Sequence, residues 1–137
     1  MGERDHLASP NIGGLDRFAF EPEKVEKPWG YELIWARSDA YAGKILFVRA
    51  GEALSLQFHN VKDEAWYVLE GRAELELGGP GERILNREVI GPGAAFRLPP
   101  GTVHRLIAVA DTKIVEVSTA ELDDVVRLED RYGRSDG

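Results

Sequence analysis

The sequence predicts an all-β fold, either a sandwich or a barrel of short strands. Glycine and proline interrupt the 137 residues at short, fairly regular intervals, as in Gly78-Gly79-Pro80-Gly81 and Pro99-Pro100-Gly101. The stretches between these breaks are rich in β-branched, aromatic and leucine residues. Before the last part of the chain, the apolar residues follow no sustained helical period. Short strands with this spacing of turn residues are typical of antiparallel sandwiches and barrels.

The turn residues divide the middle of the chain into predicted strands. In chain order, the predicted strands are 31–36, 44–49, 54–59, 65–70, 73–77, 83–90, 94–98, 103–109 and 113–118. Residues 1–23 are polar and predict an N-terminal arm, either flexible or exchanged with a second subunit. Residues 24–137 are expected to form a single domain. Its last part, from Ala120 onward, predicts a short C-terminal helical segment.

The composition excludes several classes of protein. The chain is 43% hydrophobic and 30% charged, an ordinary globular balance, and no apolar run is long enough for a membrane span. The formal net charge is −7 without a basic patch, which argues against a nucleic-acid partner. Cysteine is absent, so disulfides and thiolate metal ligands are excluded. We expect a cytoplasmic protein with neither a membrane nor a nucleic acid as partner.

Alternation along the strands predicts which polar side chains share a face, because successive side chains of a strand point to opposite sides. In the strand 54–59, Gln57 and His59 are two residues apart and therefore point the same way. Glu64 begins the next strand, and His104 lies in a later one. Three separate strands can thus direct polar side chains into one interior.

Two spaced motifs carry these residues. The first runs from Gly51 through Gln57-Phe58-His59 and Glu64 to Gly71, and the second runs from Gly93 through Pro99-Pro100-Gly101 to His104. Both spacings resemble the two motifs of the cupin superfamily, which has histidine where this chain has Gln57 and asparagine where it has Ala108. The resemblance implies a double-stranded β-helix, or jelly-roll barrel. It also implies one divalent metal, with these ligands: Gln57, His59, Glu64 and His104.

The donor set indicates the kind of metal. Two imidazoles, one carboxylate and one amide oxygen suit zinc first, with manganese, cobalt, nickel or ferrous iron as alternatives. Any one of these residues alone would be an ordinary core or surface group, so the prediction depends on their joint spacing. The alternative is a cupin that keeps the fold without the metal.

Three further segments resemble one branch of the superfamily, the type II mannose-6-phosphate isomerases. They are Lys27-Pro28-Trp29-Gly30-Tyr31-Glu32, the stretch 54–66 and the C-terminal stretch 123–134. The chain departs from the family pattern at these positions: Asn60, Val61, Lys62, Ala65 and Ala108. The resemblance implies a metal-dependent enzyme that interconverts aldose and ketose sugar phosphates through an enediolate.

Three residues are candidates for catalytic roles in such an isomerase. Arg127 lies in the matched C-terminal stretch and is expected to contact the phosphate or the enediolate, since its planar fork suits either group. Lys44 is a second cationic candidate for the pocket, and Glu116, within an apolar strand, is a candidate base. The simpler interpretations are an Arg127 ion pair with a nearby aspartate, a solvent-facing Lys44 and a structural Glu116. The tryptophans, Trp66 among them, are expected to be core or rim aromatics.

Two other functions stay open. The chain could be a different small-molecule cupin enzyme, such as an epimerase, a lyase or an oxygenase. It could also be a non-catalytic cupin that binds a metal or a carbohydrate, which the departures at Val61, Ala65 and Ala108 favour. The resemblance to cupins further implies a homodimer, in which the arm containing Phe18 and Phe20 adds a strand to the partner's sheet.

Overall fold

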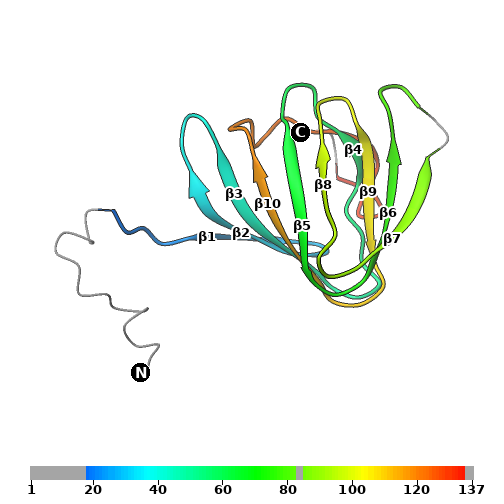
Figure 1. Ribbon diagram of the computed structural model, residues 1–137, viewed down its shortest axis with the longest axis horizontal. Coiled ribbons are helices and arrows are strands. Elements are labelled where there is room, and N and C mark those ends of the chain that lie inside the picture. Colours follow the sequence, from blue (N-terminus) through cyan, green and yellow to red (C-terminus); the bar gives the residue numbers. More distant parts are fainter. Residues whose placement is uncertain (1–17, 83–84, 135–137) are drawn as a thin grey trace.

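The computed structural model describes residues 18–82 and 85–134, and in them every regular element is a β-strand (Figure 1). The strands are β1 (Glu23–Lys27), β2 (Gly30–Arg37), β3 (Ala42–Val48), β4 (Leu56–Phe58), β5 (Glu64–Glu70), β6 (Ala73–Gly78), β7 (Asn86–Ile90), β8 (Ala95–Leu98), β9 (Val103–Ala108), β10 (Thr112–Ser118) and β11 (Val126–Glu129). The predicted all-β fold is confirmed. With no helix among these residues, none is long and apolar enough to cross a membrane.

The strands form two antiparallel sheets. One has six strands in the order β1-β2-β3-β10-β5-β8, and the other has five in the order β11-β4-β9-β6-β7. The chain passes between the sheets, so that β3 and β5 lie in one while β4 and β6 lie in the other. Strands distant in sequence therefore become neighbours, as β10 does between β3 and β5.

The two sheets enclose an interior that is apolar in one half. Alternate side chains of each strand point inward, and those buried in this half include Val48, Val68, Leu75, Leu106 and Ile114. Pairing aligns them in layers, with Ile114 opposite both Leu46 and Val68, and Leu75 opposite Leu106. Burial of this apolar surface is the main source of the fold's stability.

The prediction of a C-terminal helical segment is wrong. The tail instead forms β11, whose residues Val126 and Arg127 pair with Phe58 and Gln57 of β4. The Val125-Val126 pair favours a strand, and without β11 the short strand β4 would be an exposed sheet edge. Tertiary pairing therefore overrides the weak local preference of the acidic tail for helix.

One further strand near the N-terminus lies outside the predicted set. β1 was not predicted; it begins at Glu23, the last residue of the predicted arm, and pairs along its length with β2. Phe18 and Phe20 precede it and are exposed. Residues 1–17 of the predicted arm, residues 83–84 of one predicted strand and residues 135–137 lie outside the described residues.

Glycine is required at the turn between β5 and β6. Gly71 has a φ of +103°, and a Cβ atom there would lie 2.4 Å from the main-chain oxygen of Asp111. The left-handed backbone and the close approach of the next turn both exclude a side chain. This glycine closes the first of the two sequence motifs, so the motif spacing is in part a requirement of the turns.

Candidate metal centre

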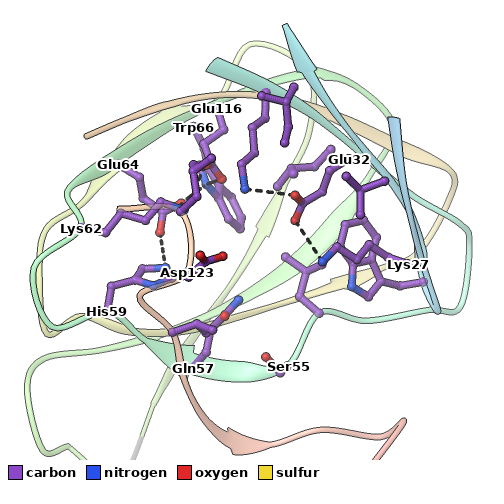
Figure 2. A pocket seen from close by; sticks show the side chains of 18 of the residues that line it. Lys27, Glu32, Ser55, Gln57, His59, Lys62, Glu64, Trp66, Glu116 and Asp123 are labelled. Atoms are coloured by element: carbon purple, nitrogen blue, oxygen red, sulfur yellow. Dashed lines mark hydrogen bonds and ion pairs between the residues drawn. The ribbon is translucent and has the colours of Figure 1, made fainter. Parts of the chain in front are cut away.

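A cavity of about 270 Å³ opens at the end of the barrel interior opposite the apolar half (Figure 2). It is lined from both sheets and from the C-terminal segment. All seven residues predicted from the sequence line this cavity: Lys44, Gln57, His59, Glu64, His104, Glu116 and Arg127. The structure therefore brings the predicted ligands and the predicted catalytic residues into one place.

Three of the predicted ligands converge on one point. His59 follows β4, Glu64 begins β5 and His104 lies in β9, and all three side chains are buried. Glu64 Oε2 lies 2.7 Å from His59 Nε2 and 3.6 Å from His104 Nε2. The ligand atoms of the three residues all lie within 4.8 Å of one another. The two sequence motifs therefore meet at one point of the barrel interior.

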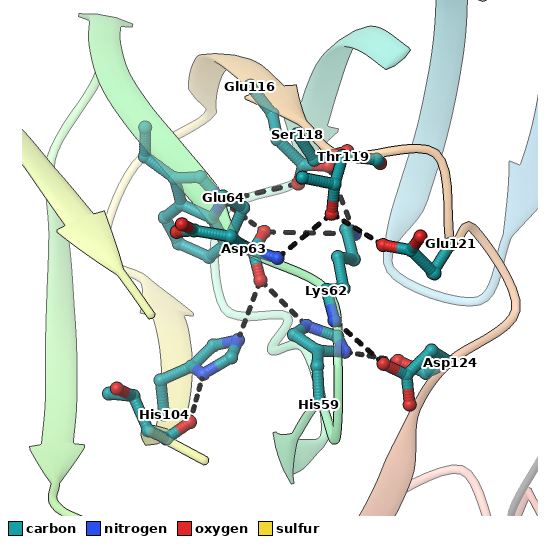
Figure 3. A network of polar contacts seen from close by, with 12 residues as sticks. His59, Lys62, Asp63, Glu64, His104, Glu116, Ser118, Thr119, Glu121 and Asp124 are labelled. Atoms are coloured by element: carbon teal, nitrogen blue, oxygen red, sulfur yellow. Dashed lines mark hydrogen bonds and ion pairs between the residues drawn. The ribbon is translucent and has the colours of Figure 1, made fainter. Parts of the chain in front are cut away.

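In each histidine ring, the hydrogen bond made by Nδ1 leaves Nε2 facing the centre of the site. His59 Nδ1 lies 2.5 Å from the main-chain oxygen of Asp124, and His104 Nδ1 lies 2.9 Å from that of Thr102 (Figure 3). A carbonyl oxygen can only accept, so each Nδ1 must donate its hydrogen. The Nε2 atom of a neutral ring then presents a lone pair to Glu64.

This geometry leaves buried polar atoms that a cation would satisfy. With neutral rings, Glu64 Oε2 and His104 Nε2 have no hydrogen-bond partner in the described part of the chain. Two nitrogen lone pairs and a carboxylate oxygen face one another away from water, which is costly without a proton or a metal between them. The residues present thus fit a divalent metal, and the backbone bonds at Nδ1 orient the rings as metal-bound histidines require.

Electrostatics favours the metal-binding protonation states. Burial lowers the pKa of the His104 imidazole, so this ring is neutral near pH 7. Burial would raise the pKa of Glu64, but the adjacent His59 imidazole and the charge of Lys62 outweigh it and hold that pKa well below its usual value. Glu64 is therefore a carboxylate, and His104 offers a free lone pair.

Gln57 completes the predicted set from the neighbouring strand. It lies in β4 directly opposite His104 of β9, and its side chain enters the same cavity as that of His59 (Figure 2). Its amide oxygen is a harder donor than the imidazole found at this position in the motif.

Glu116 lies next to this group, on β10. Trp66 Nε1–H donates both to Glu64 Oε1 at 2.8 Å and to Glu116 Oε1 at 3.2 Å, and Lys62 Nζ lies 3.2 Å from Glu116 Oε2. Burial and the nearby charge of Glu64 raise the pKa of Glu116 to about 7, although Lys62 and Lys44 oppose the shift. A carboxyl group with such a pKa can both accept and release a proton near neutrality.

A second charged group lies across the cavity from the histidines. Lys44 Nζ is 3.1 Å from Glu32 Oε1, and Lys27 Nζ is 3.9 Å from Glu32 Oε2. Figure 2 shows Glu32 and Lys27 on the opposite side of the cavity from His59 and Glu64. Lys44 is buried and lines the cavity, so it is not a solvent-facing strand end.

Arg127 reaches the cavity from β11, where it pairs with Gln57. Two of the aspartates named as its alternative partners have other roles. Asp130 receives hydrogen bonds from the Arg134 guanidinium, and Asp124 receives three from backbone N–H groups. The third, Asp123, also lines the cavity.

Most departures from the family pattern lie outside the cavity. Asn60, Val61, Ala65 and Ala108 are absent from its described lining, whereas Lys62 contributes to it. Ala108 is buried in the apolar half, opposite Ala73 of β6. Of these departures, Lys62 therefore contributes to the cavity wall and the other four do not.

Sequence reasoning missed several functional contacts. The sequence predicts only a core or rim aromatic at Trp66, yet its indole N–H joins Glu64 to Glu116. The signal was available, because Trp66 shares a strand face with Glu64 two residues earlier. Asp124 gave no such signal, since the backbone groups that it binds lie 62 to 64 positions earlier in the chain.

The chain is similar to one protein family and to several curated proteins. Residues 17–130 match the family described as "Mannose-6-phosphate isomerase C-terminal". The chain is 35% identical over 117 residues to the mannose-1-phosphate guanylyltransferase ManC of Salmonella typhimurium, covering 81% of this chain and 23% of that protein. It is 34% identical over 118 residues to the xanthan biosynthesis protein XanB of Xanthomonas campestris, covering 82% and 24%. The chain thus spans about a quarter of the length of these relatives.

Solved structures confirm the cupin fold. Oxalate decarboxylase from Bacillus subtilis superimposes with a TM-score of 0.68 at 16% identity, over 78% of this chain and 30% of that one. KdgF from Halomonas sp. superimposes with a TM-score of 0.61 at 22% identity, over 76% of this chain and 91% of that one. At these identities the likeness establishes the fold alone.

Proposed function

Because the chain belongs to the family of mannose-6-phosphate isomerase C-terminal domains, we propose that it is a metal-binding cupin that interconverts aldose and ketose sugar phosphates. The observation that carries this proposal is the convergence of His59, Glu64 and His104 beside Glu116 in one cavity. The relatives named for sugar-phosphate chemistry support the substrate class. We place the protein in the cytoplasm, as such phosphorylated substrates require.

His59, Glu64, His104 and Gln57 would hold the metal. Zinc is our first choice, because nitrogen and oxygen donors without thiolates suit it, and manganese, cobalt, nickel and ferrous iron are alternatives. When bound, the metal would supply a Lewis acid that stabilises negative charge on a sugar oxygen.

Glu116 is the proposed proton carrier. Its carboxylate takes the proton from C2 of the aldose to give the enediolate, and the protonated carboxyl returns that proton to C1 to give the ketose. A second proton moves between O1 and O2, so nothing is consumed. The Trp66 indole N–H and the Lys62 ammonium hold Glu116 in place for this transfer.

The phosphate is assigned to Arg127. A guanidinium can bind two phosphate oxygens at once, and β11 directs this one toward the cavity. Lys44 is paired with Glu32, so we propose that it stabilises negative charge in the cavity together with Lys27 rather than binding the phosphate alone.

The test is an isomerase assay on the purified chain, loaded separately with each of the five metals. We expect mannose 6-phosphate and fructose 6-phosphate to interconvert faster than in a blank containing the metal alone. Absence of turnover with every metal would contradict the isomerase. Bound iron together with oxygen uptake would instead indicate an oxygenase.

A non-catalytic sugar-phosphate-binding cupin is the second candidate. It is favoured by the names of the relatives, which describe a guanylyltransferase and a xanthan biosynthesis protein rather than an isomerase. Thermal stabilisation by sugar phosphates without turnover would identify it, because a ligand that binds the folded state raises its stability.

We also propose that the chain forms a homodimer through the outer face of its six-stranded sheet. Pairing aligns Leu33, Ile45, Val115 and Tyr67 in one row across β2, β3, β10 and β5, on the face away from the cavity. Tyr67 is 47% exposed, so the row presents apolar surface to solvent. Contiguous apolar surface of this kind is typical of protein interfaces.

Light scattering of Tyr67→Glu tests this interface. We expect the variant to be monomeric where the wild type is dimeric, because a buried carboxylate without a partner is unfavourable. Val89→Glu is the matched control, since Val89 is an exposed apolar residue on the other sheet. Deletion of residues 1–23 separates a role of the arm from that of the sheet face, and a wild-type monomer would exclude the dimer.

A further inference from the structure

The segment between β10 and β11 contacts the loop that connects two of the proposed metal ligands, His59 and Glu64. We name residues 119–125 the strap. The loop between β4 and β5 begins with His59 and ends just before Glu64. Figure 3 shows the strap, with Thr119, Glu121 and Asp124, running alongside this loop. The strap is therefore placed to control how the two ligands lie relative to each other.

One residue of the strap makes most of the contacts with this loop. The Asp124 carboxylate accepts hydrogen bonds from three consecutive backbone N–H groups, those of Asn60 at 3.1 Å, Val61 at 2.7 Å and Lys62 at 2.8 Å. Its main-chain oxygen accepts the hydrogen bond from His59 Nδ1 at 2.5 Å. Four successive residues of the loop are thus bound to a single residue about sixty positions later in the chain.

The two sets of bonds have different consequences. The carboxylate satisfies backbone N–H groups that have no strand partner, and so it fixes the path of the loop. The carbonyl oxygen can only accept, and so it fixes the His59 tautomer with the hydrogen on Nδ1. Because both belong to one residue, the carboxylate also sets where the carbonyl meets the imidazole.

We propose that Asp124 is a positioning residue, which anchors the 60–62 backbone through its side chain and thereby holds the His59 ring with Nε2 directed at Glu64. The proposal rests on the metal centre of the proposed function but not on the isomerase reaction. It assigns a role to the strap that neither the motif spacing nor the cavity lining provides.

The first test is titration of Asp124→Ala with Co²⁺ alone, followed by visible absorption. The variant keeps the main-chain carbonyl and loses only the anchor that places it. We expect the affinity for Co²⁺ to fall about 10- to 100-fold, the range typical when an outer partner of a ligand is lost. Asp124→Asn retains one acceptor oxygen and should recover part of that affinity.

Two control variants separate positioning from general support of the loop. Glu121→Ala removes an exposed strap carboxylate whose hydrogen bond is with Thr119, and it should leave the affinity unchanged. Thr119→Val removes the hydroxyl that accepts a hydrogen bond from the Asp63 N–H at 3.1 Å. It therefore weakens the contact between the strap and the loop at the end away from His59. An equal loss of affinity in Thr119→Val and Asp124→Ala, at equal unfolding midpoints in urea, would overturn the proposal.

The second test uses the metal-free protein and does not depend on metal binding. Nitrogen NMR of labelled histidine reports the tautomer of His59 directly. We expect a single Nδ1–H form in the wild type and in Thr119→Val, and a mixture of tautomers in Asp124→Ala. An unchanged tautomer in Asp124→Ala would overturn the proposal. A wild type that binds no Co²⁺ but shows this tautomer difference would contradict the proposed metal centre and leave the positioning role supported.

Discussion

The two halves of the barrel interior are built from the same strands but have opposite chemistry. Along β10 the inward side chains change from Ile114 to Glu116, and along β9 they change from Leu106 to His104. On β3 the change is from Leu46 to Lys44. A shift of two residues on one strand face therefore separates an apolar core from a charged cavity.

The difference shows that burial has opposite effects on folding in the two halves of the interior. In the apolar half, each buried side chain contributes about 1.5–3 kcal/mol through transfer from water. In the charged half, burial opposes folding, because each charged or polar group loses its hydration. Such groups are retained where burial tunes their chemistry, as in the raised pKa of Glu116.

The largest effect is expected for Glu64→Gln. The substitution removes the only carboxylate among the proposed ligands, and we expect the Zn²⁺ affinity to fall by more than about 100-fold, beyond the range typical of outer partners. Competition with a chromophoric chelator measures this affinity. Glu76→Gln is the matched control, since Glu76 is also a buried strand carboxylate but pairs with Arg87 and Arg105 away from the cavity. Equal losses in both variants would contradict the assignment of Glu64.

Glu116→Gln should reduce turnover while preserving the metal. The amide cannot accept the substrate proton, so kcat should fall about 10²- to 10⁴-fold, as is typical for loss of a general base. Elemental analysis should show the same metal content as in the wild type. Exposed Glu88 provides the control Glu88→Gln. Full activity of Glu116→Gln would exclude it as the proton carrier and leave it a structural role.

Leu106→Ala tests the apolar half. Leu106 is fully buried, and its truncation leaves a cavity, so we expect a loss of about 2–5 kcal/mol in the free energy of unfolding. Urea denaturation measures this loss. The Zn²⁺ affinity of the folded variant should stay within about twofold of the wild type, a change below ~0.5 kcal/mol. A large loss of affinity would show that the two halves are coupled rather than divided.

The smallest effect is expected at Asp130, in the tail that follows β11. Its hydrogen bonds with the Arg134 guanidinium hold the pKa of this carboxyl at about 2, below the ordinary value of 3.8. A lowered pKa in the folded state gives stability that is present above pH 4 and is lost as the pH falls toward 2. Asp130→Asn should therefore cost about 1 kcal/mol at pH 7, after allowance for solvent screening, and much less at pH 2. Urea unfolding at the two pH values checks this, and a pH-independent difference would contradict it.

Much of the fold could be predicted from local pattern. Glycine and proline mark the turns, and Gly71 has both the positive φ and the close neighbour that exclude other residues. Alternation placed Gln57 and His59 on one face, and both line the cavity. The tail could not be predicted in this way, because β11 exists only through its pairing with β4. The acidic residues around Val126 gave no sign of that partner.

The sequence by itself determined the all-β class, the turns and the shared strand face of Gln57 and His59, since each of these depends on neighbours within a few positions. Only the tertiary structure decided which atoms meet there. Glu64 faces two histidine lone pairs, Trp66 joins Glu64 to Glu116, and Asp124 holds the loop of His59 from a distant part of the chain. Hydrogen bonds and pKa shifts of this kind depend on separations of a few ångströms between residues of different strands. No sequence spacing encodes such separations, so they arise only when the two sheets are packed together.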